Sequence, residues 1–176
     1  MTPDILAAAT GISLALAKTW HGPLKTTFDE YGIDTPHRMA AFLAQVGHES
    51  AGFRYTVELW GPTAAQQGYE GRADLGNTEP GDGYRYRGRG LIQVTGRANY
   101  RQAGKALGVD LEQFPDLLAG HELAARSAGW YWQSRGLNRY ADNDDFERLT
   151  RAINGGLNGY EDRVRRLTLA EKALCG

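Results

Sequence analysis

The distribution of glycine divides this chain more sharply than any other feature of its sequence. Nine glycines and two prolines fall between residues 52 and 90, which is too irregular a stretch for a long helix. Long irregular segments inside compact domains are usually functional. The sequence therefore predicts a mainly α, two-lobed single domain of 176 residues, whose helical core comes from about 1–51 and 97–176. A small β-hairpin or loop lobe is expected over about 52–96.

Capping signals place the expected helices. Thr2-Pro3-Asp4 is a helix start, with a capping hydroxyl, a proline in the first turn and an acid near the positive end of the dipole. A first helix is therefore expected over about 3–18. Thr35-Pro36 begins a third, on which Met39, Leu43 and Val46 recur at helical spacing. The other expected elements are a short helix opened by Pro23 and ended by Gly32, one near 57–67, helices near 98–107, 121–134, 144–153 and 160–174, and a short strand or hairpin over 84–95.

The charge of the chain argues against an electrostatic partner. Its 20 basic and 21 acidic residues give a net charge of -1, so no overall basic field points to nucleic acid or an anionic membrane. The run from Tyr84 to Gly90 alternates arginine and tyrosine, which is also typical of nucleic-acid binding. Because it leads directly into the apolar pair Leu91-Ile92, a structured strand with tyrosine faces for sugars is the favoured interpretation.

Several other classes of protein are also disfavoured. Cys175 is the only cysteine, so the fold does not depend on an internal disulfide. His48-Glu49 resembles the start of a zinc-protease motif, but Gly52 stands where the second histidine belongs, so we expect neither metal nor cofactor. The apolar stretch 5–17 is too short to span a bilayer and follows Asp4 instead of a basic residue, which predicts a packed helix without membrane insertion.

Glu49 is the strongest candidate for a catalytic residue. It lies at the end of an apolar helix and just before the glycine-rich segment. The negative end of the helix dipole and partial burial both disfavour a charged carboxylate. Those conditions suit a carboxylic acid that donates a proton to a leaving oxygen. The alternative is an ordinary exposed glutamate, which the spacing alone favours because exposed glutamates are common.

An acid of this kind needs a second carboxylate. An inverting glycosidase holds its two carboxyl groups roughly 6.5–9.5 Å apart, with a water between the base and the sugar. A continuous helix would place Glu58 about 13 Å from Glu49 along its axis, so a bend at Gly52 is required. Glu70 lies on a loop that can fold back. The full set of candidates is Glu58, Glu70, Asp74, Glu79 and Asp82.

Short blocks between residues 40 and 165 give the chain a family resemblance. It resembles the family 19 glycoside hydrolases, the chitinase-like group, and the blocks occur in the family's order. The resemblance implies a mainly helical, two-lobed, lysozyme-like fold and an inverting mechanism without cofactor. The blocks are Phe42-Leu43-Ala44-Gln45, Gly47-His48-Glu49-Ser50, Tyr86-Arg87-Gly88-Arg89-Gly90-Leu91-Ile92-Gln93-Val94-Thr95-Gly96, Asn99-Tyr100, Ile153-Asn154-Gly155-Gly156 and Asp162-Arg163.

The resemblance also implies roles for individual residues. It carries the general acid onto Glu49 and the base onto Glu58, which matches a glutamate of phage-type members, or onto Glu70. Thr95 takes the place of a serine that holds the attacking water. The implied substrate-binding set is His48, Tyr86, Arg89, Gln93, Asn99, Asn154 and Arg163.

The compact, cysteine-poor chain is similar to phage endolysins in particular. The resemblance therefore favours peptidoglycan, cleaved at β-1,4 bonds between N-acetylmuramic acid and N-acetylglucosamine, over chitin. It implies a monomer that stays in the host cytoplasm before its release to the cell wall. A chitinase and a non-catalytic cell-wall binding module are the alternatives.

Overall fold

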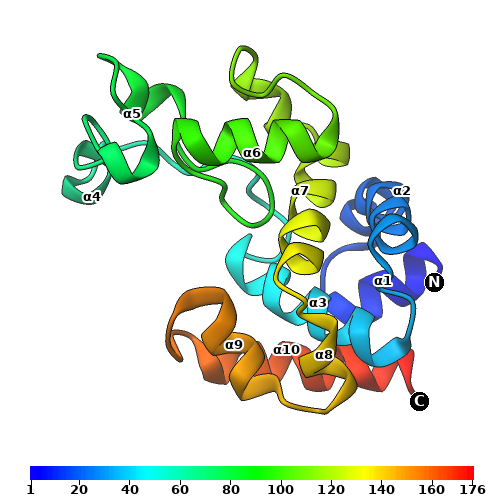
Figure 1. Cartoon of the computed structure of the whole chain (residues 1–176). Helices are drawn as coiled ribbons and strands as arrows, with labels where there is room; N and C mark the ends of the chain where they lie inside the picture. The colour runs from blue at the N-terminus through cyan, green and yellow to red at the C-terminus, as the bar shows by residue number, and fades with distance from the viewer.

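Helices dominate the computed structural model, which describes residues 1–176 (Figure 1). No helix is both long and apolar enough to span a membrane. The mainly α class predicted from the sequence is confirmed. The elements are α1 (Pro3–Thr10), α2 (Leu14–Tyr31), α3 (Pro36–Glu49), α4 (Ala64–Gln67), η1 (Ala73–Leu75), α5 (Asp82–Arg85), α6 (Arg97–Leu107), η2 (Pro115–Ala119), α7 (His121–Ser134), α8 (Asn138–Asp142), α9 (Phe146–Asn154) and α10 (Tyr160–Leu174).

The first two helices differ from the prediction. A single helix over 3–18 is wrong, because Gly11 adopts a left-handed conformation with φ of 69° and ends α1. Ser13 then accepts from the backbone N–H of Leu16 and begins α2. Pro23 lies inside α2 and does not open a helix. The apolar face of α2 continues through the proline and is buried, which offsets the lost hydrogen bond.

The predicted strand or hairpin over 84–95 is also wrong. Only two isolated bridges form, Val57 with Arg89 and Arg89 with Val94. Its first residues belong instead to α5. Gly90 and Gln93, with φ of 80° and 56°, turn the chain away from an extended path. The predictions near 98–107, 121–134, 144–153 and 160–174 agree with α6, α7, α9 and α10 to within two residues at each end.

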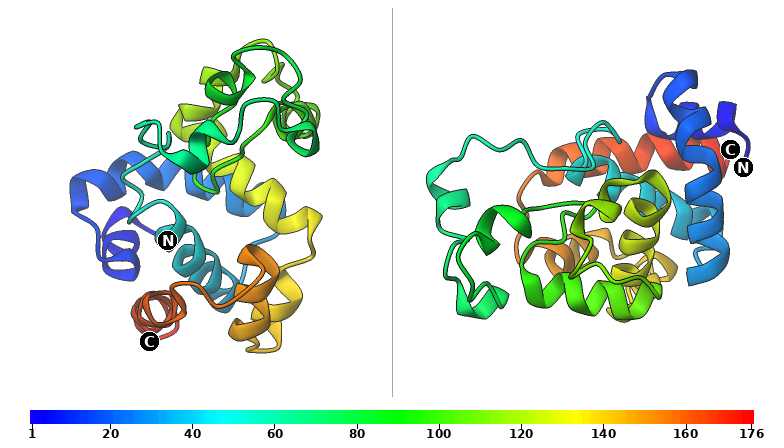
Figure 2. Two further views of the ribbon diagram at one scale, coloured as in Figure 1. Left: turned by 90° about the vertical axis from the view of Figure 1, so that its left-hand side faces the viewer. Right: turned by 90° about the horizontal axis from the view of Figure 1, so that it is seen from above.

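Two apolar clusters hold the molecule together. The larger has 24 buried residues, drawn mainly from α1, α2, α3 and α7. The smaller has seven, centred on α6 and including Tyr86 and Leu118. Figure 1 shows α7 running between two sets of helices. One set is α8, α9 and α10, and the other is α4, α5 and α6. The left view of Figure 2 shows the same division from a second direction.

The segment 54–85 contributes no apolar residue to either core. Its buried residues are Gln66, Asn77, Asp82 and Gly83. Asn77 donates to the backbone oxygen of Tyr69 and accepts from the backbone N–H of Arg97. Polar contacts of this kind, rather than buried side chains of leucine or valine, fix the path of the glycine-rich lobe.

Candidate active site

Glu49 is the last residue of α3, and the chain reverses sharply after it. Ala51, Gly52 and Phe53 all have positive φ, of 50°, 74° and 62°. The buried Phe53 anchors this turn, because its backbone oxygen accepts from the indole of Trp20 at 3.0 Å. The bend that Glu58 requires is therefore present, and α3 does not continue toward it.

A network of buried hydrogen bonds leads from α9 and α10 to the carboxylate of Glu49. Arg163 of α10, 2% exposed, donates to Glu49 Oε1 at 2.5 Å. Its second terminal nitrogen donates to Gln45 Oε1 at 2.5 Å, and Gln45 donates in turn to the hydroxyl of Thr150 at 2.8 Å. Every donor in this network is buried and paired, so the side chain of Glu49 is held in one orientation. The sequence predicted an apolar setting for Glu49, and the structure adds a guanidinium to it.

His48, beside Glu49, is fixed by a hydrogen bond to a carboxylate of α10. Its Nδ1 lies 2.8 Å from Asp162 Oδ2. Burial alone would raise the pKa of Asp162, but the hydrogen bonds from His48, Arg166 and Arg165 outweigh it and hold that pKa well below its usual range. Gly159 is essential to the packing, because a Cβ there would lie 2.2 Å from the imidazole.

The loop between α9 and α10 completes this group. Asn154 donates to the backbone oxygen of Asn158 at 3.2 Å and accepts from Gly156 at 2.8 Å. Arg163 also donates to the oxygen of Asn158, at 3.1 Å. The structure therefore brings Glu49, His48, Asn154 and Arg163 together, as the resemblance implies.

Glu58 belongs to a second group, gathered around Gly88. Its carboxylate accepts from the backbone N–H of Gly88 at 2.6 Å and from the side chain of Gln66 at 3.1 Å. A Cβ on Gly88 would lie 2.6 Å from Gln93 Oε1 and 3.3 Å from Thr95 Oγ1. Any larger residue would push the Gln93 side chain aside, so Gly88 lets Gln93 and Thr95 approach the segment that binds Glu58.

The side chains of Thr95, Gln93 and Asn99 have oxygen atoms that accept no hydrogen bond from the protein. Thr95 donates to the backbone oxygen of Gln93 at 3.1 Å, and Gln93 donates to that of Gly90 at 3.0 Å. Asn99 is exposed and donates to the oxygen of Thr95 at 2.7 Å. The side-chain oxygens of Thr95, Gln93 and Asn99 remain able to accept from a water or a sugar hydroxyl.

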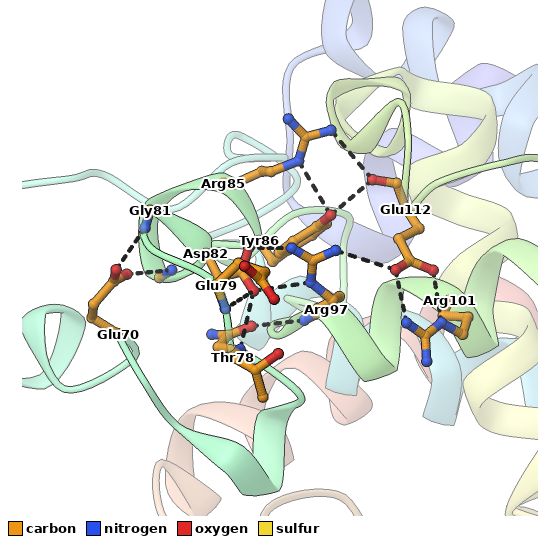
Figure 3. Close-up of polar contacts among 12 residues, drawn as sticks. Glu70, Thr78, Glu79, Gly81, Asp82, Arg85, Tyr86, Arg97, Arg101 and Glu112 are labelled. Carbon is orange, nitrogen blue, oxygen red and sulfur yellow. Dashed lines mark hydrogen bonds and ion pairs between the residues drawn. The ribbon is translucent and has the colours of Figure 1, made fainter.

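Glu70 does not join Glu58. Its two carboxylate oxygens accept from the backbone N–H groups of Gly81, at 2.6 Å, and Gly83, at 2.8 Å, where α5 begins (Figure 3). A carboxylate at this place satisfies the free N–H groups of the first turn. The geometry assigns Glu70 to capping α5 and not to a position beside Thr95, against the expectation that it is a near-equal candidate for the base.

Tyr86 and Arg89 are not placed as the resemblance implies. Tyr86 is 1% exposed and donates its hydroxyl to the backbone oxygen of Glu112 at 2.9 Å. Arg89 is 2% exposed and donates to Asp116 at 2.5 Å and to Tyr100 at 2.9 Å. Both side chains are buried in or beside the smaller core, so their assignment to substrate binding is wrong. The prediction assumed a strand over this segment, and no strand forms there.

The sequence also gave no indication of three aromatic side chains near the two carboxyl groups. Burial, together with the charge of Glu49, raises the pKa of Tyr131, whose hydroxyl donates to the oxygen of Ile153 at 3.2 Å. Burial and the neighbouring Glu58 likewise raise the pKa of Tyr69. The ring of Trp60 lies 6.3 Å from that of Tyr69. Rings beside carboxylates are suited to packing against sugar faces, but their positions depend on tertiary contacts.

The arrangement provides two carboxyl groups on separate elements. Glu49 has one oxygen held by Arg163, and the other accepts no hydrogen bond from the protein. Glu58 accepts from the backbone of Gly88, and the amide of Gln93 and the hydroxyl of Thr95 lie against that same glycine, where they can hold a water. An acid and a base supplied from opposite parts of a site are the requirement for hydrolysis of a glycosidic bond. No group of three His, Cys, Asp or Glu side chains gathers as metal ligands would.

Comparisons with known proteins agree with this chemistry. The family profile described as class I chitinase matches residues 14–147. A family 19 domain protein of Haemophilus influenzae is 36% identical over 171 residues, which cover 81% of this chain and 82% of the relative. An endochitinase of Arabidopsis thaliana is 38% identical over 133 residues, 74% of this chain, and the chain spans 44% of that enzyme's length.

Solved structures extend the likeness to the fold. Chitinase C from Streptomyces griseus superposes with a TM-score of 0.79 over 99% of this chain and 92% of that one, at 24% identity. The lysozyme-like, mainly helical architecture expected from the sequence is thereby confirmed. With its two carboxyl-bearing groups and its match to the family over most of its length, the chain belongs to glycoside hydrolase family 19 and is a glycoside hydrolase.

Proposed function

We propose that this glycoside hydrolase cleaves β-1,4 bonds between N-acetylmuramic acid and N-acetylglucosamine in peptidoglycan, as an endolysin-type enzyme. The observation that carries the proposal is the placement of Glu49, whose Oε1 is fixed by the buried Arg163 while Oε2 accepts no hydrogen bond from the protein. A compact chain with a lone exposed thiol at Cys175 also favours a wall-lytic enzyme that accumulates in the host cytoplasm as a monomer.

In the proposed reaction, Glu49 donates its proton to the glycosidic oxygen as the bond to the anomeric carbon breaks. Glu58 removes a proton from a water that the hydroxyl of Thr95 orients, and this water attacks the anomeric carbon from the opposite face. The product then has inverted configuration, and Glu49 is reprotonated from solvent. Gln93, Asn99 and Asn154 supply hydrogen bonds to hydroxyl and acetamido groups.

A chitinase is the second candidate, because the Arabidopsis relative and the Streptomyces structure are both chitinases. Chitin has the same linkage between N-acetylated amino sugars, so the acid and base chemistry serves either polymer. The two candidates differ only in whether the site accepts the lactyl ether and the peptide of N-acetylmuramic acid.

Mass spectrometry of digests tests the proposal. Purified sacculi and chitin hexamer are incubated in parallel with the wild-type chain and with Glu49→Gln. We expect muropeptides with a reducing N-acetylmuramic acid end from sacculi, and none from the variant. Cleavage of chitin alone would establish the chitinase. Products with a 1,6-anhydro end would show that the reaction is transglycosylation and not hydrolysis. The absence of cleavage products from both polymers would indicate a binding module.

A further inference from the structure

A cavity of about 790 Å³ lies on the glycine-rich lobe, outside the candidate active site. We call it the arginine groove. It is bounded by α5 on one side and by the loop that leads into η2 on the other, and Glu49, Glu58, Gln93 and Thr95 do not line it. The side chains that matter here are Tyr84, Arg85, Arg87, Phe114, Asp116 and Leu117.

Exposed apolar groups are concentrated in the arginine groove. Tyr84, Phe114 and Leu117 are 53%, 54% and 48% exposed, and they are three of the eight large hydrophobic side chains that the whole chain leaves exposed. Single exposed apolar residues are normal on a protein surface, but a set gathered in one cavity marks a binding site.

The charge of the arginine groove is not balanced within the protein. Arg85 and Arg87 form no ion pair, whereas the only carboxylate that lines the groove, Asp116, is paired with the buried Arg89. The nearby carboxylates Asp82 and Glu112 are paired with other arginines (Figure 3). Glu79 and Asp110 line the adjacent cavity that Arg85 also borders, but neither forms an ion pair with Arg85 or Arg87. The two guanidinium groups are therefore available to an anionic ligand.

Both arginines are held in place before any ligand binds. The guanidinium of Arg87 lies 4.1 Å from the ring centroid of Tyr84 and donates to the backbone oxygen of Tyr84 at 2.9 Å. Arg85 donates to the hydroxyl of Tyr86 at 3.2 Å and to the oxygen of Gln113 at 2.9 Å. Each guanidinium has five N–H donors, so several remain available for a carboxylate. Pre-organised donors reduce the entropy that binding costs.

We propose that the arginine groove binds the short acidic peptide borne by the muramyl residues of peptidoglycan. The free carboxylates of the peptide would pair with Arg85 and Arg87, and its alanine methyl groups would pack on Tyr84 and Phe114. This inference rests on the proposed function. Arg87 directly precedes Gly88, whose N–H donates to Glu58, so the same short segment links the groove to the candidate base.

Binding is measured with Glu49→Gln, so that no wall is consumed. The two ligands are intact sacculi and sacculi whose peptides have been removed by an amidase, and free stem tetrapeptide serves as competitor. We expect intact sacculi to bind at least about tenfold more tightly, as one charge-assisted contact provides. Replacing both arginines (R85Q/R87Q) should abolish the difference, and Phe114→Ala should reduce it without changing the charge.

The matched control is K18Q/K25Q, which removes two exposed positive charges from α2 and gives the same net charge. It should keep the preference for intact sacculi, and thermal melts should show that every variant is folded. Equal binding of both kinds of sacculi, no competition by tetrapeptide, or an equal loss in the control would overturn the proposal. If the wild-type chain digests sacculi but shows no preference for intact peptides, the peptide-binding role of the arginine groove is wrong and the proposed hydrolysis stands. If tetrapeptide binds but the wild-type chain does not digest sacculi, the proposed hydrolysis is wrong.

Discussion

Arg163 donates one hydrogen bond to Glu49 and another to Gln45, and it is 2% exposed between them. A buried guanidinium that lost one of these partners would keep its charge and lose its compensation, which is costly. Arg163 therefore needs both Glu49 and Gln45 as partners, and it holds the carboxylate of Glu49 in place. The first two predictions concern this contact.

Glu49→Gln should remove nearly all activity from a folded protein. The amide preserves the shape of the side chain but cannot transfer a proton, and general acid catalysis contributes about 10²- to 10⁴-fold. Release of reducing ends from sacculi or chitin oligomers measures the loss, and circular dichroism checks the fold. Glu122→Gln, on the exposed first turn of α7, is the control. Activity within a few-fold of wild type would exclude Glu49 from the mechanism.

Gln45→Leu should lower kcat about tenfold and leave KM within about twofold. Gln45 touches Arg163 and Thr150, so its role is to position Arg163 behind the acid. The variant leaves a buried donor of Arg163 without its acceptor and the hydroxyl oxygen of Thr150 without its donor, and we expect it to lose about 1–3 kcal/mol of stability as well. Gln45→Glu offers Arg163 a competing carboxylate and should change the pH profile of kcat. An unaltered pH profile with normal kcat would limit Gln45 to a structural role.

Glu58 and Glu70 should respond to alanine in different ways. Glu58→Ala should lose activity about 100-fold or more and be partly rescued by azide, because an anion needs no base. The rescued product should carry azide with inverted configuration. Glu70→Ala removes the acceptor for the N–H groups of Gly81 and Gly83, so it should lower Tm while keeping activity per folded molecule. The reverse pattern would make Glu70 the base.

Thr95→Val should lower turnover about tenfold with little change in Tm. The hydroxyl donates only to the nearby backbone oxygen of Gln93, so its loss costs little stability. Misplacement of the attacking water costs far more. Kinetics on a short amino-sugar oligomer and a thermal melt separate the two effects, with Thr95→Ser as the variant that keeps the hydroxyl. A lower Tm with normal specific activity would make Thr95 structural.

Acid should destabilise the protein partly through Glu112. Hydrogen bonds from Arg101 and, against the effect of burial, from Arg97 lower the pKa of Glu112 from 4.5 to about 2. The unfolded chain therefore binds more protons in this range, so the stabilisation is present above about pH 4.5 and is lost as pH falls toward 2. Between pH 5 and pH 2, the Tm of Glu112→Gln should fall by fewer degrees than the Tm of the wild type. Parallel curves for the variant and wild type would contradict this.

The sequence predicts best what local chemistry decides. The start of α3 could be placed because Thr35-Pro36 is a local signal, and the hydroxyl of Thr35 does accept from the backbone N–H of Arg38. α5 and α8 were not predicted, because distant side chains stabilise them. Glu70 caps α5, and Asn138 at the start of α8 donates to the oxygen of Gly32.

The site was predicted unevenly for the same reason. Glu49 stands out because it ends an apolar helix, but Arg163 is 114 positions away, and no spacing rule joins them. The resemblance supplied that residue. Gln45 was not assigned any role, because a single amide on an apolar helix face gives no sign of its partner.

Residues 54–85 bury no apolar side chain, so the two carboxyl groups lie on parts of the molecule that different interactions stabilise. Glu49 ends a helix of the larger core, which excludes water and is insensitive to salt. Glu58 is held by hydrogen bonds, in a segment that ion pairs such as Asp82 with Arg97 tie to the rest of the molecule. Denaturants and ionic strength weaken such contacts directly. The amides around Glu58 should therefore exchange with solvent before those of α3, and activity should decline under mild stress while the helical core is still intact. Operational lifetime is then set by a partial opening and not by the melting temperature of the whole protein.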